Sequence, residues 1–194
     1  MRIYDISREL CSAPLYPGTA PVELITDCSM ARGEPYNLST LRASLHAGTH
    51  CDAFLHFCDG AADIAAMPLM HYIGPCTVLE VRENASPDAA YFESRLQKDV
   101  LRLLLKSGAN AYLSPAAAQY IVARGIITIG TDALSVARPD EELPVHTALL
   151  QNDVAIIEQL DLHNVPEGNY MLFAPPVKIA GAEGAFCRAV LIAQ

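Results

Sequence analysis

The sequence lacks tryptophan, and it lacks any apolar run as long as the ~18 residues that a membrane-spanning helix needs. Gly, Pro or a charged residue interrupts each apolar stretch, so we expect a soluble protein with no membrane partner. The first ten residues, MRIYDISREL, carry charges at positions 2, 5, 8 and 9 and contain no apolar segment of the kind that a secretory signal requires. We therefore expect a cytoplasmic location.

Basic residues are also scarce. The chain has 13 Lys and Arg residues against 22 Asp and Glu residues, which gives a formal net charge of −9 with neutral histidines. The basic residues are scattered singly rather than clustered. Because nucleic acids and anionic membranes bind clustered Lys and Arg, we expect neither as a partner. Bound cations could offset part of the acid excess.

Cysteines are few, and none of them forms a CxxC pair. The six positions are Cys11, Cys28, Cys51, Cys58, Cys76 and Cys187. A chain of this length with so few cysteines is not a disulfide scaffold, so we predict buried or unreactive thiols in a reducing compartment. Cys51 differs because it lies among histidines, and a thiol beside a base can act as a nucleophile. A cysteine hydrolase is therefore one alternative.

The material for a core is ample, since 52% of the residues are hydrophobic and 18% are charged. We expect one globular domain spanning residues 1–194. Alternating or β-branched segments predict short strands at 3–7, 22–26, 38–46, 76–81, 126–130, 155–158, 170–173 and 189–192. Helices are predicted at 91–107 and at 115–124, after Ser114 as N-cap, with a helical turn at 144–152. The fold class is therefore mixed α/β (α+β), with a β-rich core and flanking helices.

Three of the six histidines fall within eleven residues, together with an aspartate: His46, His50, Asp52 and His56. Imidazole and carboxylate groups are ligands of Zn, Mn, Fe and Ni. In a straight strand His46 and His50 would lie ~13 Å apart, too far to share one ion. Gly48 permits a sharp bend between them, so we expect a strand that ends near His46 and a tight loop that presents His50 and Asp52. The alternative is a set of unrelated surface or core histidines.

Two further candidate ligands lie far along the chain. His146 begins an apolar segment, and Glu158 ends the apolar strand predicted at 155–158. A carboxylate in an apolar run needs a partner, and a metal ion is a good one. The alternative places Glu158 at a solvent-facing strand end and His146 on a helix surface. His71 and His163 have no comparable neighbours, and His163 is predicted to lie at the surface.

The stretch 46–57 resembles the signature of the cyclase-family metal-dependent hydrolases, H-x-G-T-H-x-D-x-P-x-H-F, whose best-known members are the bacterial-type kynurenine formamidases. It matches each fixed position except the proline, where this chain has Phe54. Weaker similarities follow in the family's order at 4–7, 16–18, 130–132, 145–147 and 165–168. The resemblance implies the family's swivelling β/β/α-like fold as a single domain.

The resemblance also implies a site with two divalent metal ions, zinc or manganese. The implied ligand set is His46 and His50 for one ion, His146 for the second, Asp52 as the bridge and Glu158 in contact with both. His56 would be the proton donor and acceptor. Tyr16 would contact the substrate at a position where the family often has tryptophan. These two departures, Phe54 and Tyr16, are expected to change the shape of the pocket more than metal binding.

The activity implied by the resemblance is hydrolysis of a C–N amide bond in a small aromatic substrate by metal-activated water. We expect N-formylkynurenine to be converted to kynurenine and formate, a step of tryptophan catabolism. Isatin-type or other cyclic-amide hydrolysis is an alternative, as is a non-catalytic metal-binding protein, which would not need His56. Asp132 is predicted to cap a turn, with a place in the cleft as the alternative. A homo-oligomer, dimer or tetramer, is expected because family members are commonly dimers or larger.

Overall fold

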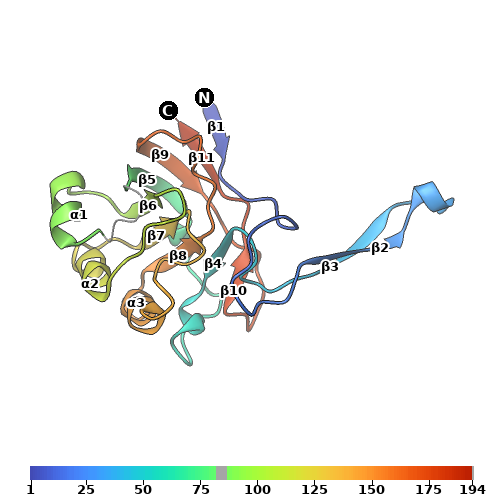
Figure 1. Cartoon of the computed structure of the whole chain (residues 1–194), viewed down its shortest axis with the longest axis horizontal. Helices are drawn as coiled ribbons and strands as arrows, with labels where there is room; N and C mark the ends of the chain where they lie inside the picture. The colour runs from blue at the N-terminus through green and yellow to red at the C-terminus, as the bar shows by residue number, and fades with distance from the viewer. Residues whose placement is uncertain (82–86, 194) are drawn as a thin grey trace.

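The computed structural model describes residues 1–81 and 87–193. Within them, nine strands form one mixed sheet in the order β1-β11-β9-β5-β6-β7-β8-β4-β10, and β2 and β3 form a separate two-stranded sheet (Figure 1). The strands are β1 Arg2–Asp5, β2 Glu23–Cys28, β3 Leu38–Arg42, β4 His50–Asp52, β5 Ile73–Glu80, β6 Arg102–Lys106, β7 Thr128–Thr131, β8 Ala155–Glu158, β9 Gly168–Phe173, β10 Gly184–Phe186 and β11 Val190–Ala193. The helices are α1 Ala89–Arg95, α2 Pro115–Ala123 and α3 Glu142–Leu150, with 3-10 turns at Met30–Arg32, Phe54–His56 and Leu69–His71.

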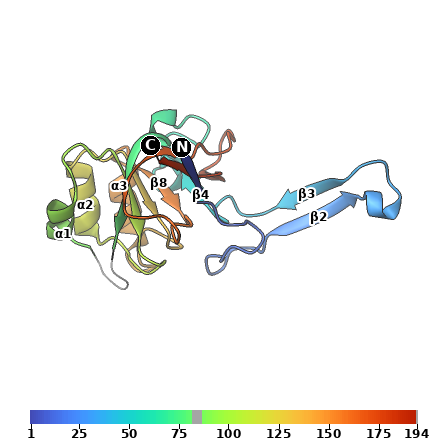
Figure 2. The same ribbon diagram turned by 90° about the horizontal axis from the view of Figure 1, so that it is seen from above.

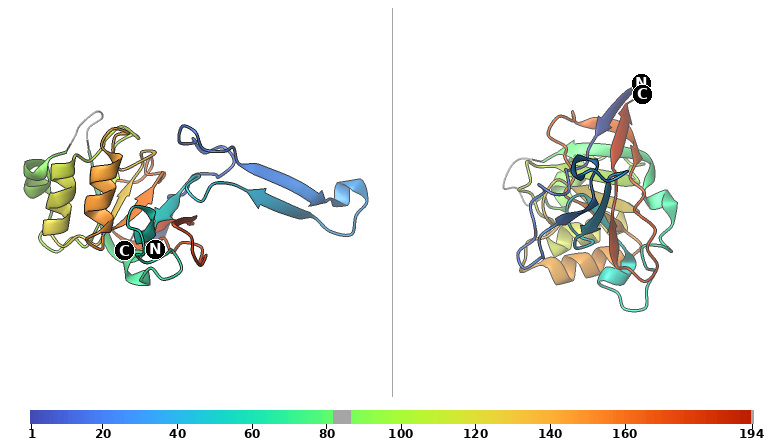
Figure 3. Two further views of the ribbon diagram at one scale, coloured as in Figure 1. Left: turned by 90° about the horizontal axis from the view of Figure 1, so that it is seen from below. Right: turned by 90° about the vertical axis from the view of Figure 1, so that its right-hand side faces the viewer.

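The centre of the large sheet is parallel. Strands β5, β6, β7 and β8 are neighbours that run in one direction, and α1, α2 and α3 each lie in the connection between two of them. Parallel neighbours need such crossover connections, and here the three helices lie side by side on one face of the sheet (Figure 3). The outer strands pair antiparallel. The predicted mixed α+β fold with a strand-rich core is confirmed.

The helix predicted at 91–107 is wrong in extent. Helix α1 ends at Arg95, and residues 102–106 form β6 between β5 and β7. Leu103, Leu104 and Leu105 of β6 are all almost completely buried. A strand that is buried on both faces reads as a continuous apolar run without alternation, so its spacing fits a helix equally well.

The other predicted elements lie at the positions where the structure has strands and helices. The strands predicted at 3–7, 22–26, 76–81, 126–130, 155–158, 170–173 and 189–192 correspond to β1, β2, β5, β7, β8, β9 and β11. Ser114 caps α2 as predicted, since its side chain accepts a hydrogen bond from Ala117 N at 3.2 Å. The predicted turn at 144–152 is helix α3. Strands β4 and β10 were not predicted, because three residues are too few for a periodic pattern.

The strand predicted at 38–46 is wrong at its end and in its setting. Strand β3 ends at Arg42, and it pairs with β2 in a hairpin that projects away from the large sheet (Figure 2). Nearly all residues of both strands are exposed. The apolar residues of β3 therefore do not mark a buried face within this chain. We call residues 23–42 the arm.

Asp132 caps a turn, as predicted. One carboxylate oxygen accepts hydrogen bonds from the backbone N–H groups of Ser107 and Gly108, both at 2.9 Å, and the other accepts from the Ser107 hydroxyl at 2.6 Å. These bonds tie the end of β6 to the end of β7, which holds the carboxyl edge of the parallel strands in place.

Candidate metal centre

Two of the predicted ligands lie on β4, a three-residue strand between β8 and β10. Because β4 and β8 are antiparallel, His50 lies directly opposite Glu158, and such partners project from the same face. Asp52 follows His50 by two residues, so it projects from that face as well. The prediction that a loop presents His50 and Asp52 is therefore wrong. The predicted bend at Gly48 is confirmed by its φ of 60°.

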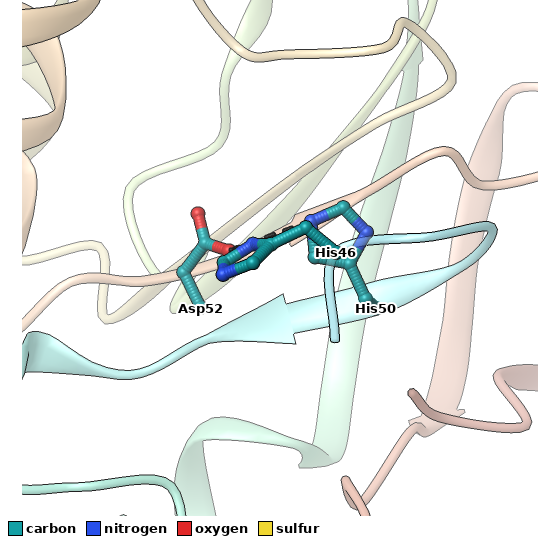
Figure 4. Close-up of side chains that lie close together, drawn as sticks. All are labelled: His46, His50 and Asp52. Atoms are coloured by element: carbon teal, nitrogen blue, oxygen red, sulfur yellow. Dashed lines mark ion pairs between the residues drawn. The ribbon is translucent and has the colours of Figure 1, made fainter. Parts of the chain in front are cut away.

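His46 and His146 approach the same point from two other elements. His46 lies in the turn before β4, and its Nδ1 is 3.0 Å from Oδ1 of Asp52 (Figure 4). His146 lies on α3, where it is buried, and its Nε2 is 3.4 Å from Oε1 of Glu158 and 3.8 Å from Oδ2 of Asp52. Three segments that are distant in the sequence, residues 46–52, α3 and β8, thus meet at one place.

Each of the two carboxylates faces histidines on two sides. Oδ1 of Asp52 faces His46 and His50, and its Oδ2 faces His146. Oε2 of Glu158 lies 3.5 Å from Nε2 of His50, while its Oε1 faces His146. The result is two clusters of three residues that share Asp52. Within each cluster the ligand atoms lie within 4.8 Å of one another. One cluster is His46, His50 and Asp52, and the other is Asp52, His146 and Glu158. The structure therefore brings all five predicted ligand residues together.

Backbone carbonyls orient two of the imidazoles. Nδ1 of His50 lies 2.8 Å from the carbonyl oxygen of Gly48, and Nδ1 of His146 lies 2.9 Å from that of Glu142. A proton on Nδ1 that is donated to a carbonyl leaves the lone pair of Nε2 free to bind a metal ion. Both Nε2 atoms point at the carboxylates, as a metal site requires.

The polar atoms at the centre are not satisfied by the protein itself. Nε2 of His50 and both carboxylate oxygens of Asp52 are buried without a hydrogen bond of normal geometry. Leaving a buried carboxylate without partners is costly. A divalent cation would satisfy these atoms, and a donor set of imidazoles and carboxylates suits zinc or manganese. The residues present fit a metal centre.

Burial and mutual attraction set the protonation of the cluster. Burial opposes a positive charge on His50, but the nearby carboxylates of Asp52 and Glu158 outweigh this effect and raise its pKa to about 10. Burial likewise opposes a positive charge on His146, but its contact with Glu158 outweighs burial and raises the pKa of His146 to about 9. Burial also opposes the charge on Asp52, but His46 and His50 lower the pKa of its carboxyl group. Protonated imidazoles therefore neutralise the carboxylates, a role that a bound cation would take over.

A cavity of about 260 Å³ opens beside the ligand clusters. His56 and Tyr16 both line it. His56 lies on the 3-10 turn Phe54–His56, outside both clusters, and its ring stacks on His46 with 4.3 Å between centroids. Burial lowers the pKa of His56, so its imidazole is neutral at pH 7. A neutral imidazole at the edge of a cavity is positioned to exchange protons with a bound molecule.

Of the two remaining sequence-based predictions, one is wrong and one is confirmed. Phe54 was expected to reshape the pocket and this is wrong, because its buried ring packs edge-on against His71 with 5.6 Å between centroids. Phe57 lines the cavity instead, and its ring stacks on His146 at 4.6 Å. His163 is exposed, as predicted.

Cys51 faces away from the ligands that flank it. Its thiol contacts the carbonyl oxygen of Ala174 at 3.6 Å, which places it on the opposite face of β4 from His50 and Asp52. Burial raises the pKa of Cys51. A buried, protonated thiol that does not line the cavity excludes the cysteine-hydrolase alternative. All six cysteines are free, as expected.

Two residues that support the site had no sequence signal of their own. Gly184 on β10 packs against His46, since a Cβ at this position would lie 2.9 Å from the imidazole. Gln159 follows Glu158 with a φ of 57°, an uncommon conformation for a residue other than glycine. Its carbonyl accepts a hydrogen bond from the Thr49 hydroxyl at 2.6 Å, which ties the His46–His50 turn to the end of β8. Thr49 is a fixed position of the signature, so the signature could have identified it.

A mixed sheet that brings two clusters of histidine and carboxylate ligands to the wall of an open cavity defines a metal-dependent hydrolase. A family model described as "Putative cyclase" matches residues 4–138. The chain belongs to this cyclase family. Within its described residues, no helix is both long and apolar enough to cross a membrane.

Curated relatives and solved structures agree with this assignment. Kynurenine formamidase of Erythrobacter litoralis is 35% identical over 202 residues, covering 98% of this chain and 93% of the relative, and that of Polaromonas naphthalenivorans is 32% identical, covering 98% and 91%. A solved structure described as a potential metal-dependent hydrolase with cyclase activity has a TM-score of 0.83 at 26% identity, covering 98% of this chain and 96% of the other. Isatin hydrolase A from Labrenzia aggregata, at 21% identity, shares the fold with a TM-score of 0.84, covering 100% and 94%.

Proposed function

We propose that the protein is an amidohydrolase that converts N-formylkynurenine to kynurenine and formate, as a cytoplasmic enzyme of tryptophan catabolism. The observation that carries this proposal is the pair of ligand clusters that share Asp52 in the wall of an open cavity, with His56 beside them. The choice of substrate is supported by the relatives named kynurenine formamidase, which align with 98% of this chain.

The five clustered side chains would hold two divalent cations, zinc or manganese. Asp52 would bridge the ions because its two oxygens face different histidines, and Glu158 would contact both for the same reason. A bound metal centre supplies water of lowered pKa and polarises a carbonyl group. The protein's own contribution is to hold His50 and His146 by their Nδ1 atoms, so that each Nε2 keeps one direction.

His56 would move the proton. Its neutral imidazole accepts a proton from the attacking water as the water oxygen adds to the formyl carbon. The imidazolium then donates this proton to the aromatic nitrogen as the C–N bond breaks, which releases the amine and formate. The stacking of His56 on His46 keeps its ring close to the centre without making it a ligand.

The cavity walls suit an aromatic substrate. Tyr16 and Phe57 line the cavity together with the ligands, and aromatic side chains favour contact with an aniline ring. Phe57 is held in place by its stacking on His146, so the aromatic wall and the metal ligand are fixed together. Tyr16 would therefore contact the substrate, at a position where the family often has tryptophan.

The direct test is a substrate panel with the metal-loaded protein. Purified protein is stripped with a chelator, reloaded with zinc or manganese, and assayed on N-formylkynurenine, formanilide and isatin. We expect kynurenine and formate to form only with metal, and N-formylkynurenine to have the highest kcat/KM. A preference for isatin would replace the proposed substrate by the cyclic amide, whereas metal binding without hydrolysis of any compound would indicate a non-catalytic metal-binding protein.

A further inference from the structure

Glu142 is a carboxylate in the cavity wall that the proposed reaction does not use. It lies in the first turn of α3, where it is half-buried, and it lines the cavity beside the metal centre. It belongs to neither ligand cluster. Because Glu142 and His146 are four residues apart on one helix, their side chains project from the same face. Helix α3 therefore presents a metal ligand and a further carboxylate side by side to the same cavity.

The Tyr16 hydroxyl lies beside the Glu142 carboxylate. Burial raises the pKa of Tyr16, and the nearby carboxylate raises it further. A turn fixes Tyr16 in this place, since Thr19 N donates to the carbonyl oxygen of Tyr16 at 3.0 Å and Gly18 has the φ of 87° that such a turn needs. A hydroxyl that donates to one carboxylate oxygen leaves the other oxygen available to a ligand.

The cavity wall offers Glu142 no Lys or Arg as a partner, as far as the described residues go. The histidines of the wall are either metal ligands in the proposed function, and therefore uncharged, or His56, whose imidazole is neutral at pH 7. The other wall residues carry hydroxyl, aromatic or apolar groups: Tyr16, Thr19, Ser44, Phe57, Leu134 and Ser135. A half-buried carboxylate among such groups favours a ligand that brings a positive charge.

The proposed substrate carries a group of this charge. At neutral pH, N-formylkynurenine has an ammonium and a carboxylate on its amino-acid side chain, apart from the formamide that is hydrolysed. The substrate carboxylate meets no Lys or Arg in the cavity wall that the described residues form, so recognition of the amino-acid group falls to its ammonium. An ammonium has three donors, and its hydrogen bonds to a carboxylate are charge-assisted.

We propose that the Glu142 carboxylate binds the ammonium group of the substrate and thereby selects an aryl formamide with an amino-acid side chain over one that lacks the ammonium. Tyr16 is a positioning residue, because its hydroxyl holds one oxygen of Glu142. The ammonium takes no part in bond cleavage, so its binding changes KM more than kcat. This inference rests on the proposed function, since it assigns a residue to the substrate named there.

The test compares two substrates that differ only in the ammonium. They are N-formylkynurenine and its desamino analogue, in which hydrogen replaces the amino group, and each is assayed with metal-loaded wild type, Glu142→Gln and Tyr16→Phe. The matched control is Glu141→Gln, which makes the same change at a neighbouring residue outside the cavity wall of the described structure. Titration calorimetry with kynurenine, which carries the same ammonium, and elemental analysis for metal are performed on the same samples.

We expect the wild type and Glu141→Gln to prefer N-formylkynurenine by about 10–100-fold in kcat/KM. Glu142→Gln should abolish this preference, mainly through KM, and should weaken kynurenine binding by a similar factor. Its metal content should equal that of the control. Tyr16→Phe should reduce the preference about 3-fold, because Glu142 keeps its charge but loses its hydrogen-bond partner.

The failures can be told apart. If the wild type hydrolyses both kynurenine compounds with equal kcat/KM, or if Glu142→Gln keeps the preference, the inference is overturned while the proposed function stands. Loss of metal from Glu142→Gln would also overturn it, since the residue would then support the metal centre. A wild type that hydrolyses formanilide or isatin but neither kynurenine compound contradicts the proposed function, and the inference falls with it.

Discussion

His50 and Glu158 are direct cross-strand partners on β4 and β8, although 107 residues separate them in the sequence. The pairing sets Nε2 of His50 3.5 Å from a carboxylate oxygen of Glu158 without any flexible loop between them. Rigid strands hold ligand atoms more precisely than loops do. The register of one short strand pair therefore positions three of the five candidate ligands, His50, Asp52 and Glu158.

Asp52 is shared by both ligand clusters, so Asp52→Asn should affect both at once. We expect the variant to lose most of its bound metal and kcat/KM to fall by more than about 100-fold, because an amide is a poor bridging ligand. Elemental analysis of the purified variant gives the metal content. The exposed His163→Ala variant is the control and should keep both metal and activity. Full metal content in Asp52→Asn would contradict a bridging role.

His56 lies outside both clusters, so His56→Ala should separate metal binding from proton transfer. The metal content is expected to stay near that of the wild type, while kcat falls by ~10²–10⁴ because no other group replaces the imidazole. Steady-state kinetics on N-formylkynurenine and elemental analysis of the same sample provide the two readouts. Unchanged kcat would remove His56 from the reaction.

Metal binding should release protons at neutral pH. The pKa values of His50 and His146 in the metal-free protein are about 10 and about 9, so both imidazoles are protonated at pH 7.5 and must lose a proton to bind an ion. Titration calorimetry in buffers of different ionisation enthalpy should show about two protons released per centre filled. Since protons compete with metal, affinity should fall as the pH is lowered. An affinity that is independent of pH would show that neither histidine is a ligand.

Gly184 leaves room for the ring of His46, so Gly184→Ala should displace it. The added methyl group would lie 2.9 Å from the imidazole and 3.1 Å from the carbonyl oxygen of Cys51. We expect metal affinity to fall about 10–100-fold while the protein remains folded. Gly130→Ala offers a contrast, because its methyl group would meet Leu104 and Leu160. That variant should lower the melting temperature with a smaller effect on metal affinity, and equal effects of the two variants would show that Gly184 has no specific role.

The ligand residues of the site were more predictable than the secondary structure and the pocket walls around them. Histidine and carboxylate spacing around Gly48 indicated a metal centre, and the five predicted ligands do meet. Their secondary structure was not predictable, because β4 is three residues long and carries no periodic signal. The pocket walls were also hidden from the sequence. Phe54 and Phe57 are similar in type and neighbourhood, but only the path of the 3-10 turn decides that Phe57 faces the cavity.

The sequence alone determined the chemistry available to this protein, because side-chain type and local spacing are properties of the chain itself. It supplied imidazoles, carboxylates and a bend at Gly48, and it excluded a membrane-spanning helix. The tertiary structure decided which groups meet, since the pairing of β4 with β8 and the packing of α3 depend on contacts between distant segments. It also decided that β6 is a strand and that the arm leaves the body, because burial is a property of the whole fold and not of any one segment.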